Sequence, residues 1–456
     1  MQDQPTALRV PDPGVRALFS ESSRWQAWLD VEVALARAEA EMGMIPAEAA
    51  DEIASKAKLE LLDRDRIVEG LRVTGHGLVP IIWELDRVCE GDAGGYIHWG
   101  ATTQNITQTG QLILLRRAHH IFLGQIADVL DAMASLAERT ADALIPGRTH
   151  GQHAVPATFG FKVAGWIDEI SRHVDRLRAA EPRIFVAMLG GGAGTMASFG
   201  EQAFELQSKF AARLEMEPMA VPARTIGDHQ TEYVTLLALL GATCSKVGHE
   251  VFELMKQEFG EVEEPISEGT VGSSTMPQKR NPKFSQDIMA AAAQLRATVP
   301  LALEAMQTEH EADRTTSVMM GSALSSATGL TADILSRMHQ LIDGLSVFPE
   351  RMRANLDLSG GMIMSEALML ELGATIGRQR AHDAVYDAAQ EAATSESTFR
   401  ELLIESDELK DRLTSDEIDV LLDPGRYAGQ CAEMARTQAV HGREVAAAIR
   451  ALPPAP

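Results

Sequence analysis

Apolar residues recur at intervals of seven in the middle of the chain, the spacing of helices that pack lengthwise against one another. The residues that form these seams are Leu115, Phe122, Val129 and Leu136 in one segment, and Tyr233, Leu240, Val247 and Leu254 in another, where Leu237, Cys244 and Val251 form a second seam. Sustained spacing of this kind predicts long helices that cross at shallow angles, as in a helix bundle.

Residues 22–42 predict a further helix near the N-terminus. An apolar stripe runs along this segment, and candidate hydroxyl caps lie between Ser20 and Ser23. Gly43 and Pro46 follow as stop signals. A packed helix is therefore expected before the long seams begin.

The remaining segments are also helical by composition. Residues 284–306 and 318–345 predict two more long helices, and shorter helices are expected around residues 368–372 and 381–389. Strand signals are almost absent. The change from long to short helices after Pro349 indicates a separate C-terminal part.

These patterns predict an all-α protein with a long central helix bundle and smaller helical domains at both ends. A chain of 456 residues exceeds what a single core normally serves. The expected domains are residues 1–105, 106–350 and 351–456.

Composition narrows the class of partner. The formal net charge of −24 disfavours nucleic acid, because a nucleic-acid binder needs a basic face. A local pair such as Lys279 and Arg280 still attracts an anionic substrate. Cys89, Cys244 and Cys431 are scattered, so they indicate neither a disulfide framework nor a zinc site. Without a signal segment or membrane span, a cytoplasmic protein is expected.

Residues 272–282, Gly-Ser-Ser-Thr-Met-Pro-Gln-Lys-Arg-Asn-Pro, are here called the serine loop. Glycine, paired serines and two prolines at these offsets predict a loop. It contains a candidate base or nucleophile (Ser273 or Ser274), a cation (Lys279) and an amide (Asn281). Such a loop is typical of a lid that closes over an anionic substrate.

Two other segments contain candidate functional residues. Residues 100–105, Gly-Ala-Thr-Thr-Gln-Asn, are called the hydroxyl turn; their side chains and backbone N–H groups at a helix start suit an anion, although they are also ordinary capping residues. Residues 147–156 are called the histidine segment and include His150 and His153. The glycine run at residues 190–194 does not match a dinucleotide-binding motif.

The order of residues in these three segments resembles the signatures of the aspartase/fumarase superfamily, which includes adenylosuccinate lyase, argininosuccinate lyase and carboxymuconate cycloisomerase. The resemblance covers nearly the whole chain. The catalytic residues that it implies are Ser273, His150, Lys279 and His76. The substrate-binding residues that it implies are Thr102, Thr103, Asn105, Gln152, Ser274, Met276, Asn281, Arg24 and His153.

The resemblance also implies a reaction. Ser273 would remove a proton beside a carboxylate, and His150 would protonate the departing amine or oxygen. The extra negative charge of the intermediate needs donors already in place, for which Lys279, Asn281 and the hydroxyls of Thr102 and Thr103 are candidates. No metal or organic cofactor is needed. Members of the superfamily are tetramers with shared active sites, so a homotetramer is expected.

Two departures from the family pattern bear on the substrate. Five residues after Asn281, most members place a glutamate that pairs with the catalytic histidine, but this chain has Gln286. Adenylosuccinate lyases hold the substrate phosphate with two arginines, and the aligned positions here are Ala312 and Gly321. Only Ser317 of that clamp is kept, so a nucleotide substrate is disfavoured.

The C-terminal segments are similar to carboxymuconate cycloisomerases. The chain nevertheless keeps His150 and His76, the histidines that the resemblance links to elimination. We therefore expect a carbon–nitrogen or carbon–oxygen lyase that acts on a small succinyl-type dicarboxylate and releases fumarate or an analogue. A lactone-forming cycloisomerase is the first alternative. A non-catalytic scaffold like the superfamily's lens crystallins is the second, because Gln286 weakens the expected histidine pair.

Overall fold

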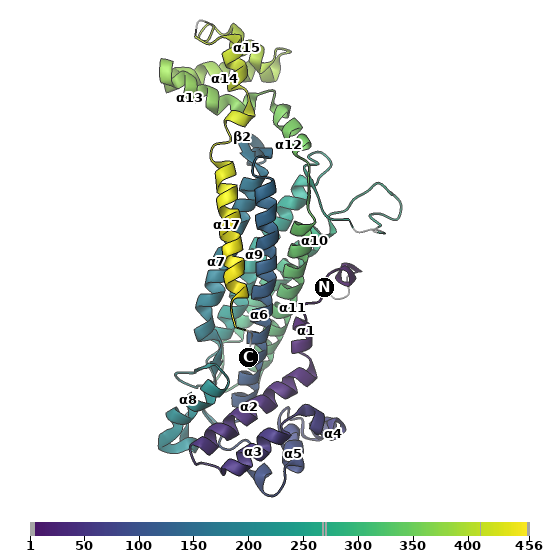
Figure 1. The fold of residues 1–456 in the computed structure, drawn as a ribbon, viewed down its shortest axis with the longest axis vertical. Coiled ribbons are helices and arrows are strands. Elements are labelled where there is room, and N and C mark those ends of the chain that lie inside the picture. The colour runs from purple at the N-terminus through teal and green to yellow at the C-terminus, as the bar shows by residue number, and fades with distance from the viewer. Residues whose placement is uncertain (1–4, 267–268, 270, 411, 454–456) are drawn as a thin grey trace.

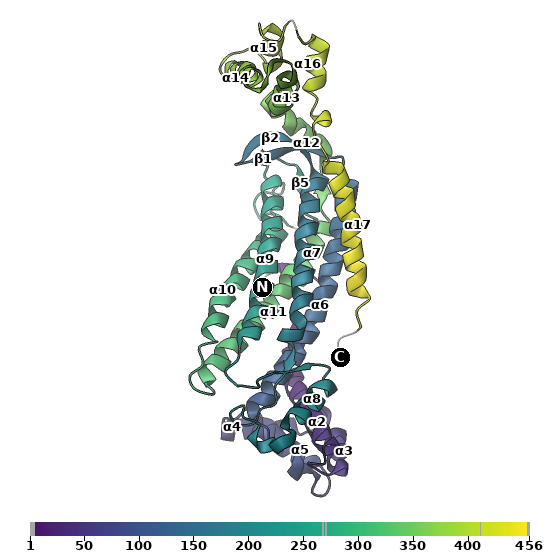
Figure 2. The ribbon, with the colours of Figure 1, turned by 90° about the vertical axis from the view of Figure 1, so that its left-hand side faces the viewer.

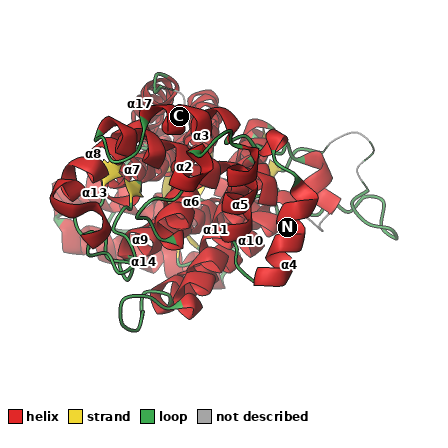
Figure 3. Cartoon of the chain, turned by 90° about the horizontal axis from the view of Figure 1, so that it is seen from below, coloured by secondary structure: helices red, strands yellow, loops and turns green. Residues whose placement is uncertain are grey.

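The computed structural model describes residues 5–266, 269, 271–410 and 412–453. The chain forms a rod with a helix bundle in its middle, a helical layer at each end and few strands (Figures 1, 2 and 3). The bundle helices are α6 (Thr103–Arg139), α7 (Phe159–Ile184), α9 (Asp228–Leu254), α10 (Lys283–Glu304) and α11 (Arg314–Asp343), and α17 (Cys431–Arg450) packs along α6 and α7.

The rod has two ends, named here after the ends of α6. α1 (Val15–Leu18) packs beside α6 and α11. At the Thr103 end lie α2 (Glu21–Glu41), α3 (Ala47–Lys56), α4 (Arg64–Thr74), α5 (Val79–Val88) and α8 (Ala203–Arg213). Beyond the Arg139 end lie α12 (Pro349–Leu356), α13 (Ser365–Ile376), α14 (Arg378–Thr394), α15 (Phe399–Glu405) and α16 (Ser415–Leu421).

The predicted helix bundle is confirmed. Leu115, Phe122, Val129 and Leu136 are all buried, and they pack in one continuous core with Tyr233 and its seam. The predicted helix at residues 22–42 is α2, and its cap is Ser20, whose hydroxyl accepts the backbone N–H of Ser23 at 3.2 Å. The heptad spacing therefore identified residues that lie between helices.

The expected domain boundaries can be compared with the positions of the helices. α6 begins at Thr103 and α12 at Pro349, close to the expected changes at residues 105 and 350. α17, which belongs to the expected C-terminal segment, runs back along the bundle and contributes Ala439 and Ala446 to its core.

Short strands occur where almost none were expected. β1 (Leu144–Thr149) pairs antiparallel with β2 (Gln152–Thr158), β3 (Val186–Ala187) pairs parallel with β4 (Glu217–Pro218), and β5 (Val262–Glu263) pairs antiparallel with β6 (Ser346–Val347). Pro146 and Pro156 face each other in the first pair, beside a bulge before Arg148. Proline cannot donate a hydrogen bond to a neighbouring strand, so its presence in a segment argues against a strand when only the sequence is considered.

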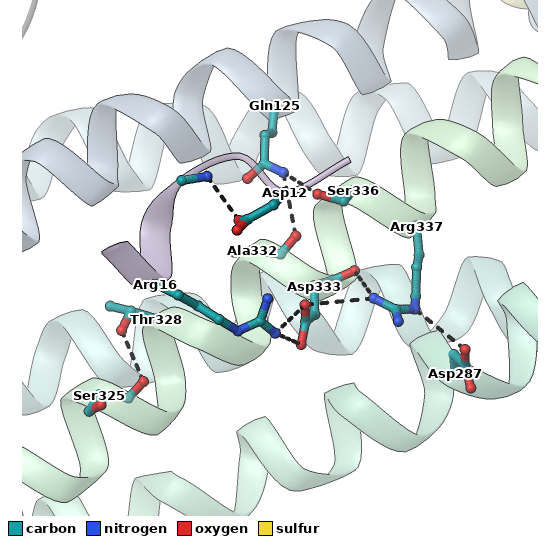
Figure 4. A network of polar contacts seen from close by, with 11 residues as sticks. Asp12, Arg16, Gln125, Asp287, Ser325, Thr328, Ala332, Asp333, Ser336 and Arg337 are labelled. Carbon is teal, nitrogen blue, oxygen red and sulfur yellow. Dashed lines mark hydrogen bonds and ion pairs between the residues drawn. The ribbon is translucent and has the colours of Figure 1, made fainter. Parts of the chain in front are cut away.

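A polar network ties the N-terminal segment to the bundle (Figure 4). Arg16 of α1 donates to both carboxylate oxygens of Asp333 at 2.6 Å. Arg337, one turn further along α11 and almost fully buried, donates to the carbonyl of Asp333 and pairs with Asp287 of α10 at 3.4 Å. Buried charges joined in this way are costly to separate, so α1 is held on the bundle.

α6 is long and apolar enough to cross a membrane by length and composition alone. In this fold its apolar residues are buried against α7, α11, α17 and α2. It is therefore the core helix of the bundle, which explains its hydropathy.

Candidate active site

The hydroxyl turn begins α6 and is fixed by hydrogen bonds. Asn105, which is fully buried, accepts the backbone N–H groups of Thr102 and Gly191 on its Oδ1, each at 3.1 Å. The buried amide therefore holds the turn in place. Thr102 and Thr103 remain only partly buried at the helix start.

The glycine run at residues 190–194 packs directly against the hydroxyl turn. Gly191 adopts a left-handed φ of 70°, and a Cβ there would come within 3.0 Å of Ser198. At Gly100, also left-handed, a Cβ would lie 2.5 Å from the ring of Phe199. Because side chains do not fit these positions, glycine is needed to bring the two segments together.

His76 approaches Thr103 from the loop between α4 and α5. Its Nδ1 accepts the backbone N–H groups of Leu78 and Val79, at 3.3 and 3.1 Å. A nitrogen that accepts these bonds carries no proton, so the proton of the neutral ring lies on Nε2. Nε2 is 3.4 Å from the hydroxyl oxygen of Thr103. When that oxygen accepts from His76, its own O–H is free to donate to a substrate carboxylate.

The histidine segment is a β-hairpin at the Arg139 end of the bundle, and His150 is at its tip. Thr149 pairs with Gln152, which leaves His150 and Gly151 as the two turn residues, with φ of 52° and 75°. His150 is exposed and makes no hydrogen bond with another described residue. His153 lies lower on β2, where burial and then the charge of Arg148 lower the pKa of its imidazole.

Arg148 anchors this hairpin, a role that the sequence reading did not assign. Its guanidinium donates to both carboxylate oxygens of Glu261, at 2.7 and 2.9 Å, and Glu261 is fully buried. The guanidinium also lies 4.8 Å from the ring centre of Phe259. Asn355 of α12 completes the shell by donating to Glu261 at 2.7 Å. No local sequence pattern links these residues, which are separated by more than ninety positions.

The serine loop lies between β5 and α10 and is closed by its own contacts. The side-chain amide of Asn281 donates to the carbonyl of Gly272 at 2.7 Å. A Cβ on Gly272 would lie 1.9 Å from the carbonyl oxygen of Lys279, so only glycine allows this close approach. Lys279 and Asn281 line a cavity of about 470 Å³ under the loop.

The two serines of this loop differ in their surroundings. The hydroxyl oxygen of Ser273 accepts the backbone N–H groups of Thr275 at 3.3 Å and Met276 at 3.1 Å. Ser274 is exposed and makes no hydrogen bond with a described residue. Backbone donors aimed at an oxygen stabilise negative charge on it. The geometry therefore prepares Ser273, rather than Ser274, to carry negative charge.

Glu264 holds the base of the serine loop to α10. Its carboxylate accepts the backbone N–H groups of Phe284 and Ser285, at 2.9 and 2.7 Å. Burial raises the pKa of Glu264 despite these bonds. Gln286 follows on the exposed side of α10 and has no hydrogen bond to His150 within the described chain.

A polar cavity of about 430 Å³ opens beside the hydroxyl turn, here called the α6 cavity. It lies between α6, α2 and the first turns of α9 and α11. Arg24, which the family resemblance placed in substrate binding, lines this cavity together with Ser317 and Gly321. The structure thus brings Arg24 to two of the positions, Ser317 and Gly321, that the resemblance aligned with the phosphate clamp of adenylosuccinate lyases.

The hydroxyl turn and the histidine segment do not meet within one chain. α6 has 37 residues, which at about 1.5 Å per residue span roughly 55 Å. Thr103 begins this helix, and the hairpin that contains His150 follows its other end. One protomer therefore groups Thr102, Thr103, His76 and Arg24 at one end, and keeps His150 far from them.

Comparison with known proteins places these features in a family. A family model described as lyase matches residues 7–296, and one described as adenylosuccinate lyase C-terminus matches residues 361–437. The chain belongs to the lyase family. The resemblance to the aspartase/fumarase superfamily is confirmed by these matches.

Individual relatives agree with this assignment. The chain is 38% identical to an N-acetyl-S-(2-succino)cysteine lyase of Dickeya dadantii, over 91% of this chain and 92% of that one. It is 38% identical to a 3-carboxy-cis,cis-muconate cycloisomerase of Pseudomonas aeruginosa, over 91% of each chain. The crystal structure of a fumarate lyase from Mesorhizobium sp. BNC1 superposes with a TM-score of 0.88 at 33% identity, covering 94% of this chain and 98% of that one. The helix-bundle fold of this lyase is thus confirmed too.

Proposed function

We propose that this lyase catalyses reversible β-elimination from a small succinyl-type substrate and releases fumarate or a fumarate analogue. The single observation that carries this proposal is the pair of backbone N–H groups that converge on Ser273 Oγ. They prepare that oxygen for negative charge, as a base that removes a carbon-bound proton requires.

The other residues supply charge and proton transfer. The O–H of Thr103, freed by the donor on His76, and the hydroxyl of Thr102 hold a substrate carboxylate at the start of α6. Lys279, which has no ion pair with a described residue, stabilises the charge that grows on that carboxylate as the proton leaves. His150 gives a proton to the leaving atom, and fumarate departs.

The leaving atom is nitrogen or oxygen in the sequence-based prediction. The name of the Dickeya relative adds a third chemistry, because its substrate has a carbon–sulfur bond to the succinyl group. The two arginines that hold the phosphate in the adenylosuccinate lyase pattern are replaced here by Ala312 and Gly321, so we propose a leaving group other than a nucleotide.

Assembly of several subunits is part of the proposal. Because α6, which spans roughly 55 Å, separates Thr103 from the hairpin that contains His150, a complete site needs His150 from another copy of the chain. We propose a homotetramer with shared active sites, located in the cytoplasm, and with neither nucleic acid nor membrane as a partner.

A cycloisomerase is the second candidate, favoured by the similarity to the Pseudomonas aeruginosa enzyme. The same groups would then act within one molecule, where a carboxylate oxygen takes the place of the external leaving group. Ser273 would still move the carbon-bound proton.

One experiment separates these functions. The protein is incubated with fumarate and a panel of amines, alcohols and thiols, or with a carboxymuconate lactone, and products are identified by mass spectrometry against an enzyme-free control. Adducts of fumarate support the lyase. Turnover of the lactone alone supports the cycloisomerase. Inertness toward every compound would leave only the non-catalytic scaffold.

A further inference from the structure

The α6 cavity is positively charged, although the chain as a whole carries a net charge of −24. Arg24 and Arg224 line it, and no aspartate or glutamate is among its lining residues in the described chain. Its remaining polar lining includes Gln104, Gln108, Gln111, Gln230, Thr308 and Ser317. A cavity with two guanidinium groups and no carboxylate attracts anions.

The direction of the amide network in this cavity is fixed by Arg224. Its Nε donates to Gln104 at 2.9 Å, and because an arginine only donates, the atom that it meets must be the amide oxygen. The amide nitrogen of Gln104 then donates to Gln108 Oε1, also at 2.9 Å. The free end of the chain of hydrogen bonds is therefore the amide nitrogen of Gln108.

That free donor has no protein partner. Gln108 is nine-tenths buried and lines the cavity, yet its Nε2 makes no hydrogen bond with any described residue. A buried donor without an acceptor costs about 1–3 kcal/mol. An acceptor oxygen on a bound molecule is the group that would satisfy it.

Two further donors point to the same ligand chemistry. The guanidinium of Arg24 is exposed and forms no ion pair with a described residue. α9 begins at Asp228 beside the cavity, its N-cap residue is Gly227, and no side chain caps this helix start. Its free backbone N–H groups and dipole favour an anion.

The cavity is continuous with the hydroxyl turn. Thr107 lines it and lies one turn after Thr103 on α6, and residues four apart share a helix face. A molecule whose succinyl carboxylate contacts Thr103 would therefore extend its other half along this face into the cavity.

We propose that the α6 cavity binds the leaving group of the substrate and selects a leaving group that carries its own carboxylate. This inference rests on the proposed elimination function. The two oxygens of a carboxylate match the free guanidinium of Arg24, and the Gln108 amide takes a neutral acceptor beside it. Arg224 already donates hydrogen bonds to Gln104 and to the carbonyl of Gly192. It therefore positions the side-chain amides and contributes positive charge to the cavity.

The test compares substrates that differ only in this carboxylate. One pair is the succinyl thioethers of N-acetylcysteine and N-acetylcysteamine; the other is the N-succinyl derivatives, joined through carbon 2 of succinate, of β-alanine and ethylamine. Fumarate release gives kcat/KM, and calorimetry with the Ser273→Ala variant gives Kd without turnover. We expect each carboxylate-bearing compound to be preferred by roughly 10- to 100-fold in both measurements.

Variants locate the preference. Arg24→Ala should reduce the ratio of kcat/KM between the two members of a pair to near one, and Gln108→Leu should reduce it by roughly 3- to 10-fold. Arg37→Ala is the control, because Arg37 is on the same helix, is exposed and pairs with Asp51 outside the cavity. It should leave the ratio unchanged.

The possible failures are distinct. Equal kcat/KM and equal Kd for both members of each pair, with fumarate released, would overturn this inference and leave the proposed function standing. A preference that survives Arg24→Ala would also overturn it. Absence of binding and of fumarate release for all four compounds would overturn the proposed function, and this inference with it.

Discussion

The two ends of α6 are built in opposite ways. At the Thr103 end, Asn105, the glycine run and His76 fix the hydroxyl turn by hydrogen bonds within the protomer. At the Arg139 end, His150 stands exposed on a hairpin tip without a partner in the described chain. The threonines that we propose to bind the substrate carboxylate are thus fixed within one chain, whereas His150, the proposed proton donor, is presented outward, as the proposed site shared with a neighbouring copy requires.

The largest expected effect separates chemistry from assembly at the serine loop. Ser273→Ala should lower kcat by roughly 10³- to 10⁴-fold because the proton-accepting oxygen is lost. The variant should keep its oligomeric state and melting temperature, since Ser273 is on a loop outside the core. Ser274→Ala is the matched control and should lose less than about tenfold. Equal losses in the two variants would contradict the assignment of the base.

The next effect tests how the exposed hairpin is held. Arg148→Ala leaves the carboxylate of Glu261 buried and uncompensated, so the free energy of unfolding should fall by about 3–5 kcal/mol. Chemical denaturation measures this loss. Arg172→Ala breaks an exposed ion pair with Asp168 and should cost less than about 1 kcal/mol. A similar small loss at Arg148 would show that the hairpin is anchored in another way.

A buried carboxyl in the layer below the Thr103 end gives a pH-dependent prediction. Glu39 is fully buried without a hydrogen-bond partner, and burial, followed by the charge of Glu32, raises its pKa to about 9. The folded state therefore binds this proton more tightly than the unfolded state, so stability falls as pH rises from the ordinary carboxyl pKa toward 9.

Glu39→Gln should remove that slope. At pH 8 the variant should be more stable than the parent by about 1–3 kcal/mol, and at pH 5 the two should differ little. Thermal melts across this range give the comparison. A variant that is less stable at pH 8 would mean that Glu39 is charged and paired in the folded protein.

The smallest expected effect concerns His76, at the Thr103 end. His76→Ala should cost about 1 kcal/mol of stability because the start of α5 loses its cap. His76→Asn should restore much of that stability, because asparagine also accepts backbone N–H groups. Both variants should raise KM for the succinyl substrate by weakening the alignment of Thr103. An unchanged KM in both would remove His76 from substrate binding.

The sequence predicted the bundle well because heptad spacing is a local property that reports directly on helix packing. Leu115 and Tyr233 were expected on seams, and both lie in the core. The hairpin was missed because Pro146 and Pro156 suppress the usual strand pattern. The motif around His150 still identified this hairpin as a segment with candidate functional residues.

The long-range partners were beyond a sequence reading. Arg148 meets Glu261 across 113 positions, and Asn105 meets Gly191 across 86. Such pairs are determined by how the helices pack, so no local spacing of residues in the sequence predicts them. For the same reason the α6 cavity became visible only when Arg24, Arg224 and Gln108 were seen together.

The most direct test of the account is whether two inactive chains restore each other. One chain carries Thr102→Ala and Thr103→Ala, the other carries His150→Gln, and the two are coexpressed with different tags and purified as mixed oligomers. Random mixing places an intact hydroxyl turn opposite an intact His150 in about a quarter of the sites of a shared-site oligomer. We predict that fumarate release returns to about a quarter of the parent activity. Mixed oligomers that remain as inactive as their parents would contradict a site shared between subunits.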